Sequence, residues 1–135
     1  MKVFLDANVI IDFLDTTRAR HLVACKLFET LSLRHTKIIM SEDILTNIFY
    51  INKNKHAVLQ FLKSIEQRWD IVYFGKQVIK NAVDLSLENN LDLEDVLQCL
   101  CAKENQCDAL ISNDVNFYDC DLNIQTAETF LACTT

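Results

Sequence analysis

Three acidic residues stand where a sheet of parallel strands would collect a ligand. Asp6 follows the apolar run at residues 2–5, Asp114 follows the run at 109–112, and Asp95 opens a predicted helix that should pack beside them. The carboxyl ends of parallel strands are where such folds bind their ligands. Three acids without a nearby Lys or Arg repel one another, and a divalent cation relieves that repulsion. Oxygen-only ligands favour Mg²⁺ or Mn²⁺, whose bound water can attack a phosphodiester.

Each of the three acids also has a plainer structural explanation. Asp6 could end a strand as a turn former, and Asp95 could complete a capping box that Asp92 begins. Asp114 could form an Asx turn within the segment SNDVN. Spacing alone leaves the ligand and the structural interpretations open.

Short apolar runs alternate with segments of helical periodicity along the whole chain. The expected strands are 2–5, 37–40, 70–74, 109–112 and 123–125. The expected helices cover 18–33, 41–51, 58–65, 76–88, 93–104 and the segment after Thr126, with Ser41, Asp92 and Thr126 as N-caps. This alternation predicts an α/β fold with a parallel central sheet of about five strands and helices on both faces. The length of 135 residues fits a single domain over residues 1–135.

Composition excludes several classes of function. The chain has one Gly, Gly75, and no Pro. Phosphate-binding loops, dinucleotide-binding turns and the nucleophile elbow of hydrolases all need several glycines at fixed spacing. The net charge is −6, so binding to a nucleic-acid backbone requires a local basic patch or a bound cation.

The six cysteines and three histidines show no zinc-site spacing, because CxxC and HxxxH are both missing. Cys99 and Cys101 lie two apart on a predicted helix and point to different sides. We therefore expect all six cysteines to be thiols that act as small core hydrophobes in a reducing cytoplasm.

No membrane or export segment is expected. The chain has no run of 18 apolar residues. Asp6, Asn8 and Asp12 interrupt the apolar stretch near the N-terminus, which is unlike a signal peptide. These features predict a soluble cytoplasmic protein.

Four segments taken together resemble the PIN-domain family, in particular its VapC-like toxin ribonucleases. They are, in chain order, FLDANVIIDFL, LEDVLQCLCAKEN, CDALISNDVNF and NIQTAETFL, and the resemblance covers essentially the whole chain. It implies a parallel sheet flanked by helices and Mg²⁺- or Mn²⁺-dependent endonucleolytic cleavage of RNA. It also implies a small antitoxin as partner and a homodimer.

The resemblance also assigns roles position by position. The catalytic and metal-binding acids would be Asp6, Asp95 and Asp114. The supporting polar positions would be Asn8, two residues after the first acid, and Ser112 and Asn113, just before the last.

The chain departs from the family pattern at two positions. Asn47 stands where the family normally has a Glu, and Asn116 stands where many members have an Asp. Asn47 shares a predicted inward helix face with Ile44 and Ile51, where it could act as a neutral ligand or hold a metal-bound water. One carboxylate fewer should weaken cation binding, and Asp43, one turn earlier, could compensate. The alternative is a catalytically weakened module that binds RNA or a protein without cleaving.

A third reading, a phosphatase with Asp6 as nucleophile, has less support. Such an enzyme would need a second Asp where Asn8 stands, and a catalytic Lys.

Two surfaces are candidates for macromolecular contacts. Tyr50, Lys53, Lys55 and His56 could meet RNA by stacking and phosphate contacts, or could be an ordinary solvated turn between helices. Arg18, Arg20 and His21 form a second basic cluster with the same two interpretations.

An apolar groove between the helix expected at 18–33 and a helix in the first motif, FLDANVIIDFL, could accept an antitoxin helix. Its residues would be Phe13, Leu14, Leu22 and Phe28, for which core packing is the alternative role.

Overall fold

The computed structural model describes residues 1–133 of the chain. Its strands are β1 (Lys2–Leu5), β2 (Lys37–Ser41), β3 (Asp70–Val72), β4 (Ala109–Ile111) and β5 (Ile124–Gln125). Its helices are α1 (Ala7–Leu14), α2 (His21–Leu33), α3 (Glu42–Ile51), α4 (Lys55–Ile65), α5 (Lys76–Asn89), α6 (Leu93–Glu104) and α7 (Ala127–Ala132). The predicted alternation of strands and helices is confirmed, with most boundaries shifted by one or two residues.

The strands form one parallel sheet in the order β3-β2-β1-β4-β5. The central strand β1 pairs on one side with β2, through Phe4 and Ile39, and on the other with β4, through Phe4 and Leu110. The chain therefore winds outward from β1 in one direction and returns to build the other half. In open parallel sheets, ligands bind at such a reversal point, which here lies beyond the carboxyl ends of β1 and β4.

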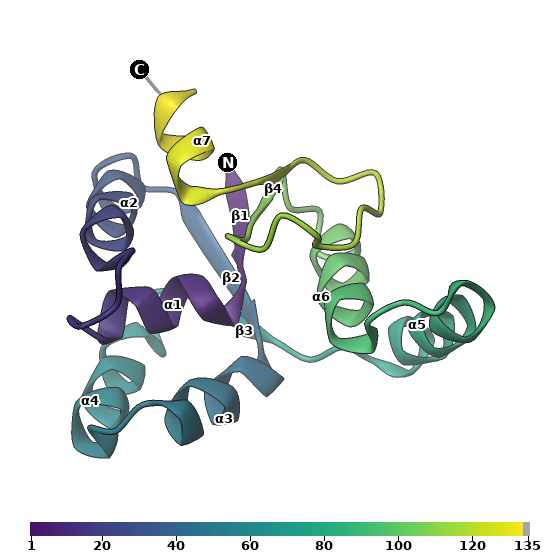
Figure 1. Cartoon of the computed structure of the whole chain (residues 1–135), viewed down its shortest axis with the longest axis horizontal. Helices are drawn as coiled ribbons and strands as arrows, with labels where there is room; N and C mark the ends of the chain where they lie inside the picture. Colours follow the sequence, from purple (N-terminus) through teal and green to yellow (C-terminus); the bar gives the residue numbers. More distant parts are fainter. Residues whose placement is uncertain (134–135) are drawn as a thin grey trace.

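Helices cover both faces of the sheet, as predicted. Figure 1 shows α1, α2 and α4 on one side and α6 with α5 on the other. The inner strands are buried on both faces, which explains their uninterrupted apolar sequences. Val3, Phe4 and Leu5 of β1 and all three residues of β4 have no exposed surface.

Two of the three predicted N-caps are confirmed. The side chain of Asp92 accepts a hydrogen bond from the Asp95 backbone N–H (3.1 Å), and Thr126 accepts one from Thr129 (3.1 Å). Ser41 occupies the N-cap position of α3, but its hydroxyl donates to the Asp43 carboxylate instead of capping the helix. The prediction of a capping role for the Ser41 side chain was wrong.

The expectation that every cysteine is a free thiol was wrong for two of them. Cys99 of α6 and Cys120 of the segment between β4 and β5 form a disulfide. This segment folds back onto α6, a tertiary contact that helical spacing could not show. Burial raises the pKa of the Cys101 thiol to about 12 and that of Cys107 to about 11, so both stay protonated at neutral pH.

Two apolar residues assigned to inward helix faces point outward. Leu22 of α2 is 80% exposed and Ile51 at the end of α3 is 54% exposed. Helix α2 begins at His21, three residues later than predicted, so Leu22 lies in its first turn. In the part of the chain that the structure describes, no helix is long and apolar enough to cross a membrane.

Candidate active site

Asp6 lies at the carboxyl end of β1, beside β4, at the point where the sheet order reverses. It is the residue between β1 and α1, and it is only 7% exposed. Its backbone N–H donates to the Ile111 carbonyl (3.0 Å), which extends the pairing of β1 with β4. The Ser112 hydroxyl donates to the Asp6 carboxylate (2.9 Å) and so fixes its orientation.

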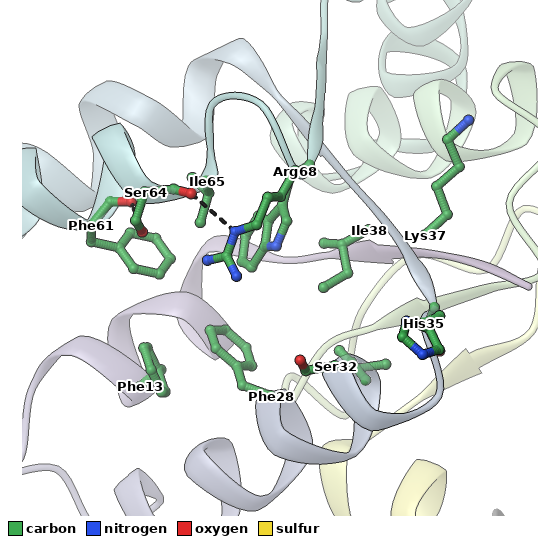
Figure 2. Close-up of a pocket in the computed structure, with 13 residues that line it drawn as sticks. Phe13, Phe28, Ser32, His35, Lys37, Ile38, Phe61, Ser64, Ile65 and Arg68 are labelled. Carbon is green, nitrogen blue, oxygen red and sulfur yellow. Dashed lines mark hydrogen bonds between the residues drawn. The ribbon is translucent and has the colours of Figure 1, made fainter.

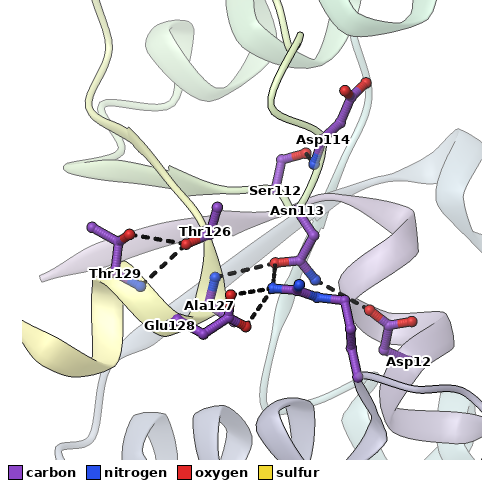
Figure 3. Close-up of polar contacts among 9 residues, drawn as sticks. Asp12, Ser112, Asn113, Asp114, Thr126, Ala127, Glu128 and Thr129 are labelled. Atoms are coloured by element: carbon purple, nitrogen blue, oxygen red, sulfur yellow. Dashed lines mark hydrogen bonds and ion pairs between the residues drawn. The ribbon is translucent and has the colours of Figure 1, made fainter.

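Asp114 follows β4 and is tied to the same serine. Its backbone N–H donates to the Ser112 hydroxyl oxygen (3.2 Å), as Figure 3 shows. Its exposed carboxylate accepts the Asn116 backbone N–H (2.9 Å), which is the Asx turn considered above. The Asx turn leaves this carboxylate at the surface, just after the end of β4.

Asp95 comes from the first turn of α6, which the Asp92 cap starts. Burial raises the pKa of the Asp95 carboxyl to about 7, with further contributions from the negative charges of Asp92, Asp6, Asp114 and Glu94. These charges act on one another because three separate elements deliver their acids to one edge of the sheet. Among residues 1–133 no three His, Cys, Asp or Glu side chains are already close enough to hold a metal ion.

Asn47 faces α6 instead of the core. It is half-buried, and its amide Nδ2 donates to Glu94 Oε1 (3.0 Å). The predicted inward orientation was wrong. Helix α3 packs on α1, its buried residues are Ile44 and Ile48, and the Asn47 side stays open. A shallow groove of about 370 Å³ lies there, lined by Asp43, Thr46, Asn47, Tyr50, Ile51 and Glu94.

Sequence reasoning missed Glu94 and Gln98, which both point toward Asp43. Burial raises the pKa of the Glu94 carboxyl, as do the charges of Asp43 and Asp6. Gln98 is fully buried, with Nε2 at 3.4 Å from Asp43 Oδ2 and 3.5 Å from Glu94 Oε1. In the sequence, these two residues could have been recognised only by their position. Glu94 directly precedes Asp95 in the first turn of α6, and Gln98 follows one turn later.

The donor chemistry of this edge suits a hard divalent cation. Its ligands would be carboxylate and amide oxygens, which Mg²⁺ and Mn²⁺ prefer. Within the described chain, no Lys or Arg forms an ion pair with Asp6, Asp43, Glu94, Asp95 or Asp114. The buried Gln98 Oε1 also has no hydrogen-bond partner there. The residues present therefore fit such an ion.

The raised pKa of Asp95 gives a testable pH dependence of stability. The folded state binds this proton up to about pH 7, whereas the unfolded chain releases it near 3.8. The stability of the metal-free protein is therefore highest at low pH with respect to this group, and it falls as pH rises from about 4 through 7. Thermal unfolding in EDTA should show a smaller decrease between pH 5 and pH 8 for Asp95→Asn than for the parent.

The matched control for this prediction is Asp84→Asn, because Asp84 is exposed on α5 and pairs with Lys80. It should keep the parent's pH dependence. If Asp95→Asn keeps it too, the raised pKa is not a property of the folded protein.

A second network ties the Asp114 loop to the helices on the other side (Figure 3). Asp12 is 3% exposed, and its carboxylate accepts from Arg18 Nε at 2.7 Å. It also accepts from Asn113 Nδ2 at 3.1 Å, a contact drawn in Figure 3. Asn113 Oδ1 accepts from Arg20 (3.0 Å) and from the Ala127 backbone N–H (3.2 Å). Arg20 also pairs with Glu128. Arg18 and Arg20 are therefore engaged within the protein and do not form a free basic patch.

The remaining predicted residues lie at or near the surface. Lys55 Nζ donates to the carbonyls of Phe49, Tyr50 and Asn52, so it closes the end of α3 and is not free for phosphate. Tyr50 is 75% exposed in the groove beside Asn47. Four further predicted residues are exposed at the surface: Asn8, Lys53, His56 and Asn116.

Comparison with known proteins identifies the family. The model of the PIN domain matches residues 3–122. The chain belongs to the PIN domain family. Ribonuclease VapC1 of Aquifex aeolicus (strain VF5) is 33% identical over 133 residues, which is 96% of this chain and 92% of the relative.

Solved structures share the PIN fold at low sequence identity. Mycobacterium tuberculosis VapC20, a Sarcin-Ricin loop cleaving toxin, has a TM-score of 0.73 at 11% identity, covering 85% of this chain and 92% of its own. VapBC2 from Rickettsia felis, bound to a DNA fragment from its promoter, has a TM-score of 0.70 at 15% identity, covering 93% and 98%. A toxin–antitoxin complex from Klebsiella pneumoniae has a TM-score of 0.69 at 18% identity, covering 93% and 97%.

Proposed function

We propose that this protein is a Mg²⁺- or Mn²⁺-dependent endoribonuclease and the toxin of a toxin–antitoxin pair. The observation that supports the proposal is that Asp6 and Asp114 both bond the Ser112 hydroxyl, while the charges of both also act on Asp95. Among the described residues, no Lys or Arg forms an ion pair with any of these three acids. The relative named a ribonuclease and the solved toxin named for cleaving the Sarcin-Ricin loop support the choice of RNA as substrate. As a nuclease of cellular RNA, the protein would act in the cytoplasm.

In the proposed mechanism, Asp6, Asp95 and Asp114 hold the metal and no side chain serves as nucleophile. When bound, the divalent ion supplies an activated water and neutralises charge that develops on the phosphate. The Ser112 hydroxyl holds the Asp6 carboxylate in a fixed orientation at the end of β1. Tyr50 offers an exposed ring at the end of the groove, on which an RNA base can stack.

The proposed antitoxin would use an aromatic cavity on the side of α1, α2 and α4. Figure 2 shows Phe13, Phe28 and Phe61 facing one another there, and Trp69 completes the ring cluster. The cavity measures about 660 Å³ and opens beside Arg68. This shape and composition suit an apolar segment that carries an acidic residue. The predicted groove residues Phe13 and Phe28 line it, whereas Leu22 does not.

A homodimer is also part of the proposal. Helix α5 exposes Ile79, Val83 and Leu87, which share one face at a spacing of four residues. Burial of this apolar stripe against a second copy would remove it from water. Sedimentation of the purified protein checks this part independently of activity.

The function is tested by cleavage of a mixed RNA pool by the purified full chain. Mn²⁺ should give discrete 5′ and 3′ products. Excess EDTA should abolish them, because the proposed mechanism has no side-chain nucleophile that could act without the metal. Readdition of Mn²⁺ should restore the products. If cleavage persists in EDTA, the proposed metal chemistry is wrong.

The absence of an acid at Asn47 favours one alternative, a PIN module that binds RNA without cutting it. Such a module would retain RNA in a binding assay and give no products at any Mn²⁺ concentration. That pair of results would replace the nuclease proposal.

A further inference from the structure

We infer that Glu94 replaces the carboxylate that this chain lacks at position 47 and, with Asp43 and the Gln98 side-chain oxygen, completes the cation site. This inference rests on the proposed function, since it assigns further residues to the same metal centre. It implies that Asn47 is a compensated substitution and does not mark a lost site.

The contact between Asn47 and Glu94 is the first observation. The amide Nδ2 of Asn47 donates to Glu94 Oε1 at 3.0 Å, across the interface between α3 and α6. A Glu at position 47 would set two carboxylates against each other at this distance, whereas an Asn holds the carboxylate of Glu94 in place. The amide on α3 and the acid on α6 therefore fit as a pair.

Gln98 provides a second and independent observation. Its side chain has no exposed surface, and its Nε2 lies between Asp43 Oδ2 and Glu94 Oε1, at 3.4 and 3.5 Å. Its Oε1 is buried and has no partner within the described residues. Such an oxygen is costly to leave unsatisfied, and a cation or a water bound to one would satisfy it.

The carboxylates of Asp43 and Glu94 are reachable by a hydrated ion, whereas Gln98 lies buried behind them. Asp43 and Glu94 line the open groove of about 370 Å³ next to α3. Asp43 and Asp6 also act electrostatically on each other, as do Glu94 and Asp6. The Asp43–Glu94 pair thus extends the acidic edge from Asp6 toward Tyr50, along the surface proposed for RNA.

The test is calorimetric titration of the EDTA-treated full chain with Mn²⁺ alone. Glu94→Gln keeps the acceptor for Asn47 and removes the charge, and it should weaken Mn²⁺ binding at least tenfold. It should also raise the melting temperature of the metal-free protein, because it removes repulsion with Asp43. The matched control is Glu104→Gln, at the exposed end of the same helix, which should leave the dissociation constant within twofold of the parent.

A reciprocal exchange, Asn47→Glu with Glu94→Asn, separates a ligand from a purely structural residue. It moves the carboxylate to α3 and the amide to α6, and it should restore Mn²⁺ binding to within about threefold of the parent. If the exchanged protein folds but binds as weakly as Glu94→Gln, Glu94 acts through local structure and the inference is wrong.

Asp6→Asn distinguishes failure of this inference from failure of the proposed function. If Glu94→Gln binds Mn²⁺ like the parent while Asp6→Asn loses binding, only the role of Glu94 is refuted. If neither change affects Mn²⁺ binding, the metal centre itself is refuted.

Discussion

Asp6→Asn should reduce RNA cleavage about a thousandfold or more, equivalent to roughly 4 kcal/mol of lost transition-state stabilisation. Asp6 is the most buried of the predicted acids, at 7% exposure, and it stands where the order of the sheet reverses. Asn has the same shape and can still accept the Ser112 hydrogen bond. The change therefore removes a charge without removing the local structure.

The same variant should be at least as stable as the parent when no metal is bound. Burial raises the pKa of Asp6, and the charges of Asp114 and Asp43 raise it further, so the ionised form is unfavourable in the folded protein. Cleavage in Mn²⁺ and thermal unfolding in EDTA are measured together, with Asp84→Asn as the charge-matched control. Equal cleavage by Asp6→Asn and the parent would remove Asp6 from the active site.

Asp12→Ala should cause a large loss of stability, about 2–3 kcal/mol. It leaves Arg18 without its counter-charge and the Asn113 amide without its acceptor. Asp12 is 3% exposed, and its carboxylate binds both Arg18 and Asn113. For a chain of this size the melting temperature should fall by roughly 10 °C. RNA cleavage should also fall, because Asn113 precedes Asp114 and holds its loop against α7.

Asp84→Ala is the control for this prediction. It breaks the exposed Lys80–Asp84 pair (3.0 Å), which should cost about 0.5 kcal/mol or less. Chemical denaturation of both variants gives the comparison. If the two changes cost the same, the Asp12 network does not support the fold.

Local patterns were sufficient for most of the secondary structure of this chain, although they gave no range for α1. The buried strands β1 and β4 have continuous apolar sequences because both of their faces are covered, and such runs are visible without any structure. The caps at Asp92 and Thr126 are equally local, since a side chain bonds a backbone N–H three residues on. The placement of Asp6 and Asp114 at strand ends followed from the same runs.

Contacts between distant segments were not accessible in this way. Helical spacing placed Asn47 with Ile44 and Ile51, but the packing of α3 on α1 decided which side of the helix is open. Likewise, the disulfide of Cys99 and Cys120 depends on how the segment after β4 returns to α6. Arg18 and Arg20 looked like a surface patch because their partners Asp12, Asn113 and Glu128 lie in other elements.

The sequence by itself determined the strands, the helices and the three acids at their ends, because these depend on periodicity and on neighbours a few residues away. Only the tertiary structure decided that Asn47 meets Glu94 and that Gln98 is buried between two carboxylates. Those contacts join residues through the packing of helices on the sheet. Local sequence patterns do not show which distant residues this packing brings together.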